Sequence, residues 1–194
     1  SQKTQIRHKC TRCKPCGTGA TRRVSAEVSL QLNPTLSHTL CYLGLGGNLG
    51  HPMALFDEVI DYFRAHSCAK AVRESLRFES APVDATGPNY VNSVLELMWQ
   101  GNAEQLLHTC MAIESQLGRV RTTRNAPRPI DVDVLLFGQQ TVNTSQLKVP
   151  HPRMHLRRFV LDPLLQLNPE IEIPGLGPAK NHLPGTLDQI VKAI

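Results

Sequence analysis

The sequence has no apolar run near the ~20 residues that a membrane-spanning helix requires, so such a helix is excluded. It also lacks the apolar core of a signal peptide and the paired cysteine spacing of a secreted disulfide scaffold. Its six cysteines lie in a basic N-terminal region (Cys10, Cys13, Cys16) and in an apolar body (Cys41, Cys68, Cys110). Isolated thiols suit a reducing compartment. We therefore expect an intracellular, cytoplasmic protein.

Acidic residues are missing from residues 1–26, which contain seven lysines and arginines. Residues 27–194 then carry 14 basic and 16 acidic residues, a net charge of −2, although the whole chain has +5. The basic charge belongs to a tail, and the body shows no nucleic-acid footprint. We predict that residues 1–38 form a disordered tail and that residues 39–194 form one domain.

The first methionine is Met53, so we expect the sequence to start within a longer product or after processing. The tail is rich in Arg and Thr, as transit peptides are, and import into an organelle is the alternative location if it acts as one.

The body alternates between strand and helix patterns. Strands are predicted at 39–45, 70–80, 90–99 and 129–138, and helices at 51–66 and 103–117. A short hairpin, a helix around 159–167 and a small terminal helix at 186–194 follow. The order β-α-β-β-α-β is typical of ferredoxin-like domains. We predict an α+β fold, a ferredoxin-like sandwich with an extra C-terminal hairpin and helices.

Two aspartates stand two residues apart in the last long strand pattern, IDVDVLL. Because strand side chains alternate, Asp131 and Asp133 should share one face, opposite Val132. Their roots are then roughly 6–7 Å apart, close enough for both carboxylates to bind hard cations. The alternative is the solvated face of an edge strand, which alternation alone does not distinguish.

A dense set of basic residues flanks this strand. Upstream lie Arg119, Arg121, Arg124 and Arg128, and downstream lie His151, Arg153, His155, Arg157 and Arg158. Acids that hold Mg²⁺ and guanidinium groups that clamp phosphate oxygens are the side chains an Mg²⁺-bound polyphosphate needs. A solvated basic surface and an RNA contact are the alternatives. RNA is disfavoured because only Tyr90 and Trp99 are candidates for stacking on bases.

The glycine-rich segment GLGGNLG (44–50) says little by itself. It lacks the GK[ST] ending of a Walker loop, and Leu49 stands where a dinucleotide-binding motif has its third glycine. We interpret it as a tight turn between a strand and a helix.

Five segments together carry a more specific pattern. They are GGNLG (46–50), PNYVNSVLEL (88–97), IESQLGRVR (113–121), APRPIDVDVLLFG (126–138) and VPHPRMHLRRFVLDPL (149–164). In their order and spacing the chain resembles the 6-hydroxymethyl-7,8-dihydropterin pyrophosphokinase family over about residues 41–194. The resemblance implies a ferredoxin-like fold. It also implies transfer of pyrophosphate from ATP to the pterin's hydroxymethyl oxygen, releasing AMP, in folate biosynthesis.

The resemblance also implies roles for single residues. Asp131 and Asp133 match the ligands of two Mg²⁺ ions, and with Arg119 and Arg128 they form the expected catalytic set. The residues that match ATP contacts are Glu114, Arg119, Arg121, Arg128, His151 and Arg157. Those that match pterin contacts are Tyr90 and Phe159 as an aromatic pair, Asn92 at the ring edge, and Ser80 and Val83 in a closing loop. For the two aromatic residues, core packing is the alternative.

The chain departs from the family pattern in three places. Gly47 stands where the family usually has Ser, which we expect to be a mild change at a turn. Asn125 replaces an aromatic residue in a lid loop that is one residue shorter, and the loop 79–90 is also shorter than in some members. We expect an active enzyme with altered lid behaviour.

The tail carries a separate motif, HKCTRCKPC, whose cysteines and His8 have a spacing compatible with zinc. Ala20 stands where an iron–sulfur run would have its fourth cysteine, and no second knuckle follows. We interpret the motif as part of an unstructured or targeting tail.

A non-catalytic nucleotide- or RNA-binding module of the same topology is the alternative function. The paired aspartates favour the enzyme, because a pure binder has no need for metal-bridging acids. We expect a monomer that binds its small-molecule substrates and neither nucleic acid nor membrane.

Overall fold

The computed structural model describes residues 37–82, 87–119 and 128–194, which lie within the compact unit Pro34–Ile194. Its centre is an antiparallel sheet of six strands. They are β1 (His38–Gly47), β2 (Ala69–Glu74), β3 (Phe78–Ser80), β4 (Tyr90–Gln100), β5 (Asp131–Phe137) and β10 (Val191–Ala193). The order across the sheet is β10-β3-β4-β1-β5, and β2 also pairs with β4. This mixed architecture agrees with the predicted α+β class.

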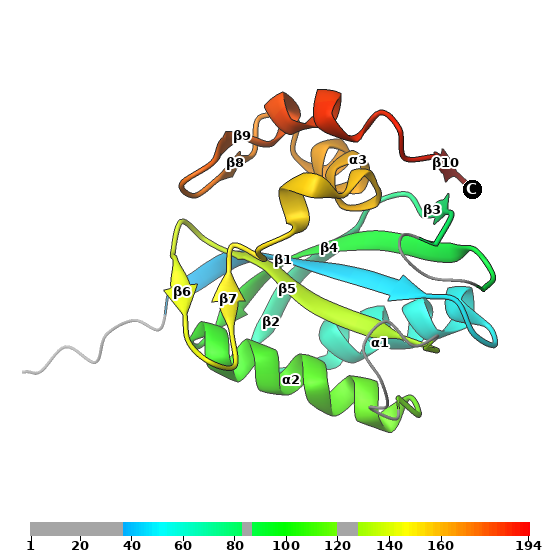
Figure 1. The fold of residues 1–194 in the computed structure, drawn as a ribbon. Coiled ribbons are helices and arrows are strands. Elements are labelled where there is room, and N and C mark those ends of the chain that lie inside the picture. The colour runs from blue at the N-terminus through cyan, green and yellow to red at the C-terminus, as the bar shows by residue number, and fades with distance from the viewer. Residues whose placement is uncertain (1–36, 83–86, 120–127) are drawn as a thin grey trace, which may run out of the picture. The chain divides into compact units, whose positions relative to one another are not determined.

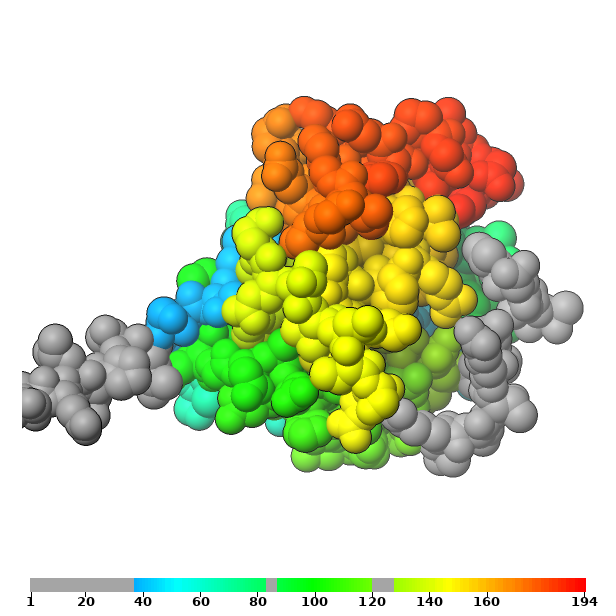
Figure 2. Space-filling model, turned by 60° about the vertical axis from the view of Figure 1, so that its left-hand side comes forward, coloured from blue at the N-terminus to red at the C-terminus, as the bar shows by residue number. Residues whose placement is uncertain are grey.

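Helices cover both faces of the sheet (Figure 1). On one face lie α1 (Pro52–Ala65) and α2 (Ala103–Gln116). On the other lie α3 (Arg158–Leu167) and two 3₁₀ helices, η1 (Met154–Leu156) and η2 (Ala179–Thr186). Two hairpins complete the described chain, β6 (Val142–Asn143) with β7 (Lys148–Val149) and β8 (Glu172–Ile173) with β9 (Gly177–Pro178). Figure 2 shows the part from α3 to the C-terminus, orange to red, as one continuous patch of the surface.

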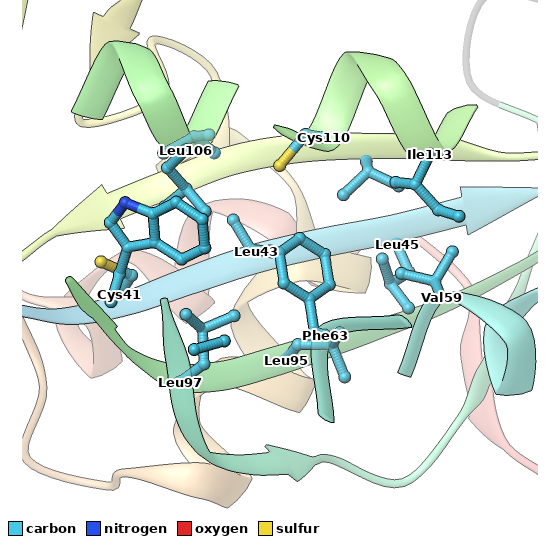
Figure 3. Packing of buried hydrophobic residues seen from close by; sticks show 14 of the residues in the cluster. Cys41, Leu43, Leu45, Val59, Phe63, Leu95, Leu97, Leu106, Cys110 and Ile113 are labelled. Atoms are coloured by element: carbon cyan, nitrogen blue, oxygen red, sulfur yellow. The ribbon is translucent and has the colours of Figure 1, made fainter. Parts of the chain in front are cut away.

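The larger core lies between the sheet and the pair α1 and α2 (Figure 3). Leu43 and Leu45 of β1 and Leu95 of β4 are buried in it. Because strand side chains alternate, Tyr42 and Val94 face the other way and pack in a second core with residues of α3. Around Tyr42 and Val94 the two central strands are therefore covered by apolar side chains on both faces.

The start of α2 is fixed by a capping box. Asn102 Oδ1 accepts a hydrogen bond from Gln105 N at 2.8 Å, and Gln105 Oε1 accepts one from Asn102 N at 2.9 Å. Within α2, Cys110 is buried, whereas Met111 is exposed. Glu114, one turn after Cys110, is buried instead, which brings a carboxylate against β5.

The single strand predicted at 70–80 is wrong, because the structure has two strands there with a break at Ser75 to Arg77. Ser75 Oγ accepts a hydrogen bond from Val94 N at 3.0 Å, and its own N–H donates to the Val94 carbonyl. Arg77 turns toward α1, where its guanidinium donates to the Met53 carbonyl at 2.9 Å and pairs with Asp57 at 2.5 Å.

The terminal helix predicted at 186–194 is also wrong. Residues 191–193 form β10, which pairs antiparallel with β3, and Val191 lies opposite Ser80. Leu187 and Ile190, two apolar residues of this segment, are 67% and 79% exposed, so a helix here would have no buried apolar face. Pairing with the edge of β3 satisfies the backbone instead.

No helix in the described ranges is long and apolar enough to cross a membrane. The tail predicted at 1–38 lies outside the described residues except for its last two positions, and β1 already begins at His38. The tail and its cysteine motif stay predictions.

Candidate active site

A cavity of about 290 Å³ lies on the side of the sheet that faces η1 and α3. Its lining contains eight of the predicted site residues: Ser80, Tyr90, Asn92, Arg128, Asp131, Asp133, Arg157 and Phe159. They come from β3, β4, β5 and the segment around η1 and α3, so residues far apart in the sequence meet at one place. The remaining wall is partly apolar, with Leu135, Leu156 and Val160.

The floor of the cavity owes its space to two glycines. Gly44 and Gly46 lie within β1, on the same face as Tyr42, and both line the cavity. At these two positions the sheet carries no side chain that would fill the space. The glycine-rich segment interpreted as a turn is thus partly wrong, because β1 continues through Gly47. The alternation of glycine at 44 and 46 is the signal that would have indicated an open sheet face.

The predicted alternation in β5 is confirmed. Asp131 and Asp133 both line the cavity, opposite Gly46 and Gly44 of β1, while Val132 is buried in the other core. Burial, followed by the charge of Asp131, raises the pKa of Asp133 to about 6. Two partly buried carboxylates that repel one another form a place where a divalent cation would be favourable. Within the described ranges no group of three or more His, Cys, Asp or Glu side chains is placed to hold a metal.

Two arginines neutralise Asp131. Arg119 Nη1 lies 2.5 Å from Asp131 Oδ1, and Arg128 Nη1 lies 3.1 Å from Asp131 Oδ2. Arg128 Nε is buried and has no hydrogen-bond partner among the described residues. A buried guanidinium N–H of this kind is suited to an additional anionic acceptor.

Glu114 is held by the protein from two sides. Its Oε1 accepts a hydrogen bond from the Val132 N–H at 2.7 Å, and it forms an ion pair with Arg119. Burial nevertheless raises the pKa of this carboxyl to about 7. Glu114 thus fixes the position of Arg119 relative to β5. Glu114 and Arg119 do not belong to the cavity lining.

His151 lies just before η1, and it too is outside the cavity lining. Burial, followed by the charges of Arg157 and Arg153, lowers its pKa to about 4, so the ring is neutral near pH 7. Its Nδ1 accepts a hydrogen bond from Arg153 N at 3.3 Å. In the neutral ring the proton is therefore on Nε2, which is available as a donor.

Other side chains of the same lining suit a flat polar ring. Tyr90 and Phe159 are half-buried and both line the cavity, and the Arg157 guanidinium lies 5.5 Å from the Phe159 ring centroid. The buried Asn92 donates from Nδ2 to Ser80 Oγ at 2.9 Å. This bond fixes the orientation of the amide, so that its Oδ1 faces the open space above Gly46.

Sequence reasoning gave no role to Asn48. It is buried, and its Oδ1 accepts a hydrogen bond from Arg128 N at 3.1 Å. Its Nδ2 donates to the Pro88 carbonyl at 3.4 Å. Asn48 therefore connects the end of β1 with the approaches to β4 and β5. Val83, Arg121, Arg124 and Asn125, which the sequence singled out, lie outside the described residues, and so does the lid loop around Asn125.

The chain matches a family model described as 7,8-dihydro-6-hydroxymethylpterin-pyrophosphokinase (HPPK) over residues 42–169. The chain belongs to this family. The matched range begins in β1 and ends just after α3, so it contains every cavity-lining residue discussed above.

Individual HPPK-family relatives agree. The chain is similar to "2-amino-4-hydroxy-6-hydroxymethyldihydropteridine pyrophosphokinase" from Pseudomonas aeruginosa, with 38% identity over 147 residues, 75% of this chain and 88% of the relative. The Bacillus subtilis protein of the same name is 33% identical over 136 residues, 70% of this chain and 81% of the relative. A third relative, "Folic acid synthesis protein fol1" from Pneumocystis carinii, is 32% identical, but the match covers only 19% of its length.

Proposed function

We propose that this HPPK-family enzyme transfers the pyrophosphoryl group of ATP to 6-hydroxymethyl-7,8-dihydropterin, giving AMP and the pterin diphosphate. The observation that carries the proposal is the composition of one cavity. Carboxylates and guanidinium groups lie in the same lining as a fixed buried amide and two half-buried aromatic side chains. The first set suits a polyphosphate and the second suits a flat heterocycle. Membership of the family disfavours the alternative of a non-catalytic binding module.

Asp131 and Asp133 fit the role of Mg²⁺ ligands. A cation bound between them would offset their mutual repulsion and would lower the raised pKa of Asp133. Two carboxylates make an incomplete coordination shell, and Mg²⁺ commonly completes it with substrate phosphates and water. When bound, two such ions would neutralise the charge that develops on the transferred phosphate oxygens. In binding metal, Asp131 would release Arg119 and Arg128 for the phosphates.

The guanidinium groups would hold the polyphosphate. Arg128 offers its buried Nε–H, and Arg157 lies among the cavity residues. His151, neutral with its proton on Nε2, would donate a hydrogen bond to a phosphate oxygen without adding charge. Glu114 would act through Arg119 on the nucleotide side. Arg121 completes the proposed set.

Pterin binding falls to the aromatic and amide side chains of the lining. Tyr90 and Phe159 would contact the two faces of the ring, and the Asn92 amide would bind its edge. Ser80, which accepts the hydrogen bond from Asn92, would keep that amide in place. Val83 is proposed to contribute from the neighbouring loop.

Transfer needs positioning more than an activated protein nucleophile. The hydroxymethyl oxygen of the pterin forms a bond to the β-phosphorus of ATP. The bond between that phosphorus and the oxygen bridging to the α-phosphorus breaks, and AMP leaves with the bridging oxygen. The hydroxyl proton passes to water. Arg119, Arg128 and Arg157 would stabilise the negative charge that moves during this exchange.

The proposal includes a ferredoxin-like topology. In the sheet, β4 lies between β1 and the strands β2 and β3, which is the split βαβ pattern if β2 and β3 count as one interrupted strand. The monomeric state, the cytoplasmic location and the absence of nucleic-acid and membrane partners remain predictions.

The test is AMP formation from ATP by the full chain with Mg²⁺, with and without 6-hydroxymethyl-7,8-dihydropterin. AMP that appears only with the pterin supports the function, and Asp133→Asn is the matched inactive control. AMP release without pterin, or no AMP with both substrates present, would contradict it.

A further inference from the structure

The arginines around the cavity fall into two electrostatic classes. Arg119 and Arg128 are ion-paired with acidic side chains. Arg153 and Arg157 also line the cavity, yet within residues 37–82, 87–119 and 128–194 neither forms an ion pair with a carboxylate, although the charges of Asp133 and Asp131 act on Arg157. By contrast, the neighbouring Arg158 pairs with Asp162 at 3.1 Å.

Arg153 and Arg157 are held at fixed places by η1. The two residues flank this 3₁₀ helix as its N-cap and C-cap. Met154 between them is fully buried in the second core, and backbone bonds from Leu156 N to the Arg153 carbonyl and from Arg157 N to the Met154 carbonyl close the turn. The segment therefore does not need to refold in order to present both side chains.

The charge of Arg153 acts on its surroundings in the cavity wall. After burial it is the main cause that lowers the pKa of Arg157, and it contributes to the low pKa of His151. The guanidinium groups at 153 and 157 therefore repel one another. An anion between them would remove this repulsion, and a phosphate offers oxygens that match the planar donor fork of arginine.

We propose that Arg153 is a further phosphate-binding residue of this site and that, together with Arg157, it binds oxygens of the polyphosphate chain. The inference rests on the proposed function, because it takes the anion to be the triphosphate of the nucleotide. Arg153 would add a phosphate contact from the start of η1, whereas Arg119 follows α2 and Arg128 precedes β5.

The class of ligand follows from the charges in the cavity. Asp131 and Asp133 face the same space, so a simple carboxylate ligand would gain little from the site as a whole. A polyphosphate is long enough to engage two arginines at one end and a carboxylate-bound cation at another. Inorganic tripolyphosphate therefore tests the anion contacts without the base, the sugar or the pterin.

The experiment measures binding of inorganic tripolyphosphate with Mg²⁺ by calorimetry to the full chain and to Arg153→Gln. We expect tripolyphosphate to bind the unmodified chain and the Kd of Arg153→Gln to rise about tenfold, the loss typical of a charge-assisted contact. Arg153→Lys should recover part of the affinity, because it restores the charge without the planar fork. Arg158→Gln is the matched control, since it removes the same charge from an arginine that Asp162 already neutralises, and its Kd should change less than twofold.

Ionic strength separates a contact from long-range attraction. At 0.5 M KCl, long-range electrostatic attraction is largely screened. A difference in Kd between Arg153→Gln and the unmodified chain that persists at this salt concentration therefore supports direct binding. Equal Kd values for the two proteins, an equal loss in Arg158→Gln, or a difference that vanishes in high salt would overturn the inference. Failure of the proposed function shows separately, as absence of pterin-dependent AMP formation by the unmodified chain.

Discussion

Asn48 binds the backbone of Arg128 in both directions, once through its side-chain oxygen and once through its own backbone N–H. Arg128 N donates to Asn48 Oδ1 at 3.1 Å, and Asn48 N donates to the Arg128 carbonyl at 3.1 Å. The residues are 80 positions apart. These two bonds fix the backbone from which the Arg128 side chain extends, and its guanidinium in turn forms an ion pair with Asp131.

Asn48→Ala should therefore damage the nucleotide side more than the pterin side. It leaves the partly buried Arg128 N–H without its acceptor, which costs about 1 kcal/mol of unfolding free energy. We expect a higher Kd for ATP with a smaller change for the pterin, measured by calorimetry. Asn48→Asp keeps the acceptor for Arg128 N, loses the donor to Pro88 and adds a negative charge, so it is the matched variant for stability and not for ATP binding. An unfolding free energy for Asn48→Ala equal to that of Asn48→Asp, or equal effects of Asn48→Ala on ATP and pterin binding, would contradict the assignment.

Substitution by alanine should affect stability at Gly47 and ligand binding at the adjacent Gly46. A Cβ on Gly47 would lie 2.4 Å from the Pro129 carbonyl oxygen, a backbone atom that must shift. We expect Gly47→Ala to lower the unfolding free energy by about 1–3 kcal/mol in urea denaturation. The expectation from sequence that position 47 lies at a turn is wrong, because Gly47 is the last residue of β1 and lies close to Pro129, whereas the mild effect of glycine at this position stays a prediction.

Gly46→Ala should instead spare the fold and affect binding. A Cβ there meets only Asn92 Oδ1, at the ordinary contact distance of 3.6 Å. It would enter the cavity beside the amide proposed for the pterin edge, so the pterin Kd should rise at unchanged melting temperature. A lower melting temperature for Gly46→Ala, or an unchanged pterin Kd, would contradict the proposal that the pterin binds over Gly46.

Asp133→Asn should abolish transfer and stabilise the unliganded protein above pH 6. Loss of a metal ligand is worth several kcal/mol of transition-state stabilisation, so we expect AMP formation to fall by about 100-fold or more. Because the pKa of Asp133 is raised to about 6, the folded state binds its proton more tightly than the unfolded state does. The contribution of this group to stability is present below its ordinary pKa of 3.8 and is lost as pH rises through 6.

Asparagine removes that loss, so the melting temperature of Asp133→Asn minus that of the unmodified chain should be more positive at pH 7.5 than at pH 4.5. The comparison between the two proteins cancels the other titrating groups. A melting temperature difference that is independent of pH would show that the pKa of Asp133 is not raised in the folded protein.

Asn92→Ala should raise the Kd for the pterin by about tenfold and leave the Kd for ATP nearly unchanged, because a ring-edge hydrogen bond is lost. Ser80→Ala provides a graded control. It removes the acceptor that orients Asn92 Nδ2 without removing the amide, so its effect should have the same direction and be smaller. Equal effects of Asn92→Ala on both ligands would contradict a pterin-side position.

Local patterns predicted much of this architecture. The alternation around Asp131 and Asp133 places both carboxylates correctly because β5 obeys strand periodicity and has a covered face. The failures are long-range. The residues before the C-terminus have a helical pattern, but the free edge of β3 decides their conformation. Likewise, the sequence identifies the arginines as phosphate-binding types, but which of them is already ion-paired depends on Glu114 and Asp131 in space. The contact from Asn48 to Arg128 has no local signature at all.

The pairing of β10 with β3 joins the C-terminal residues of this sequence to one wall of the cavity. Val191 lies opposite Ser80, and Ile194 N donates to the Arg77 carbonyl at 2.9 Å. An affinity tag, a surface linkage or a fused domain attached after Ile194 would therefore pull directly on the strand that carries Ser80. Such an attachment would perturb the cavity wall at Ser80 before it disturbed β5, the strand that carries Asp131 and Asp133.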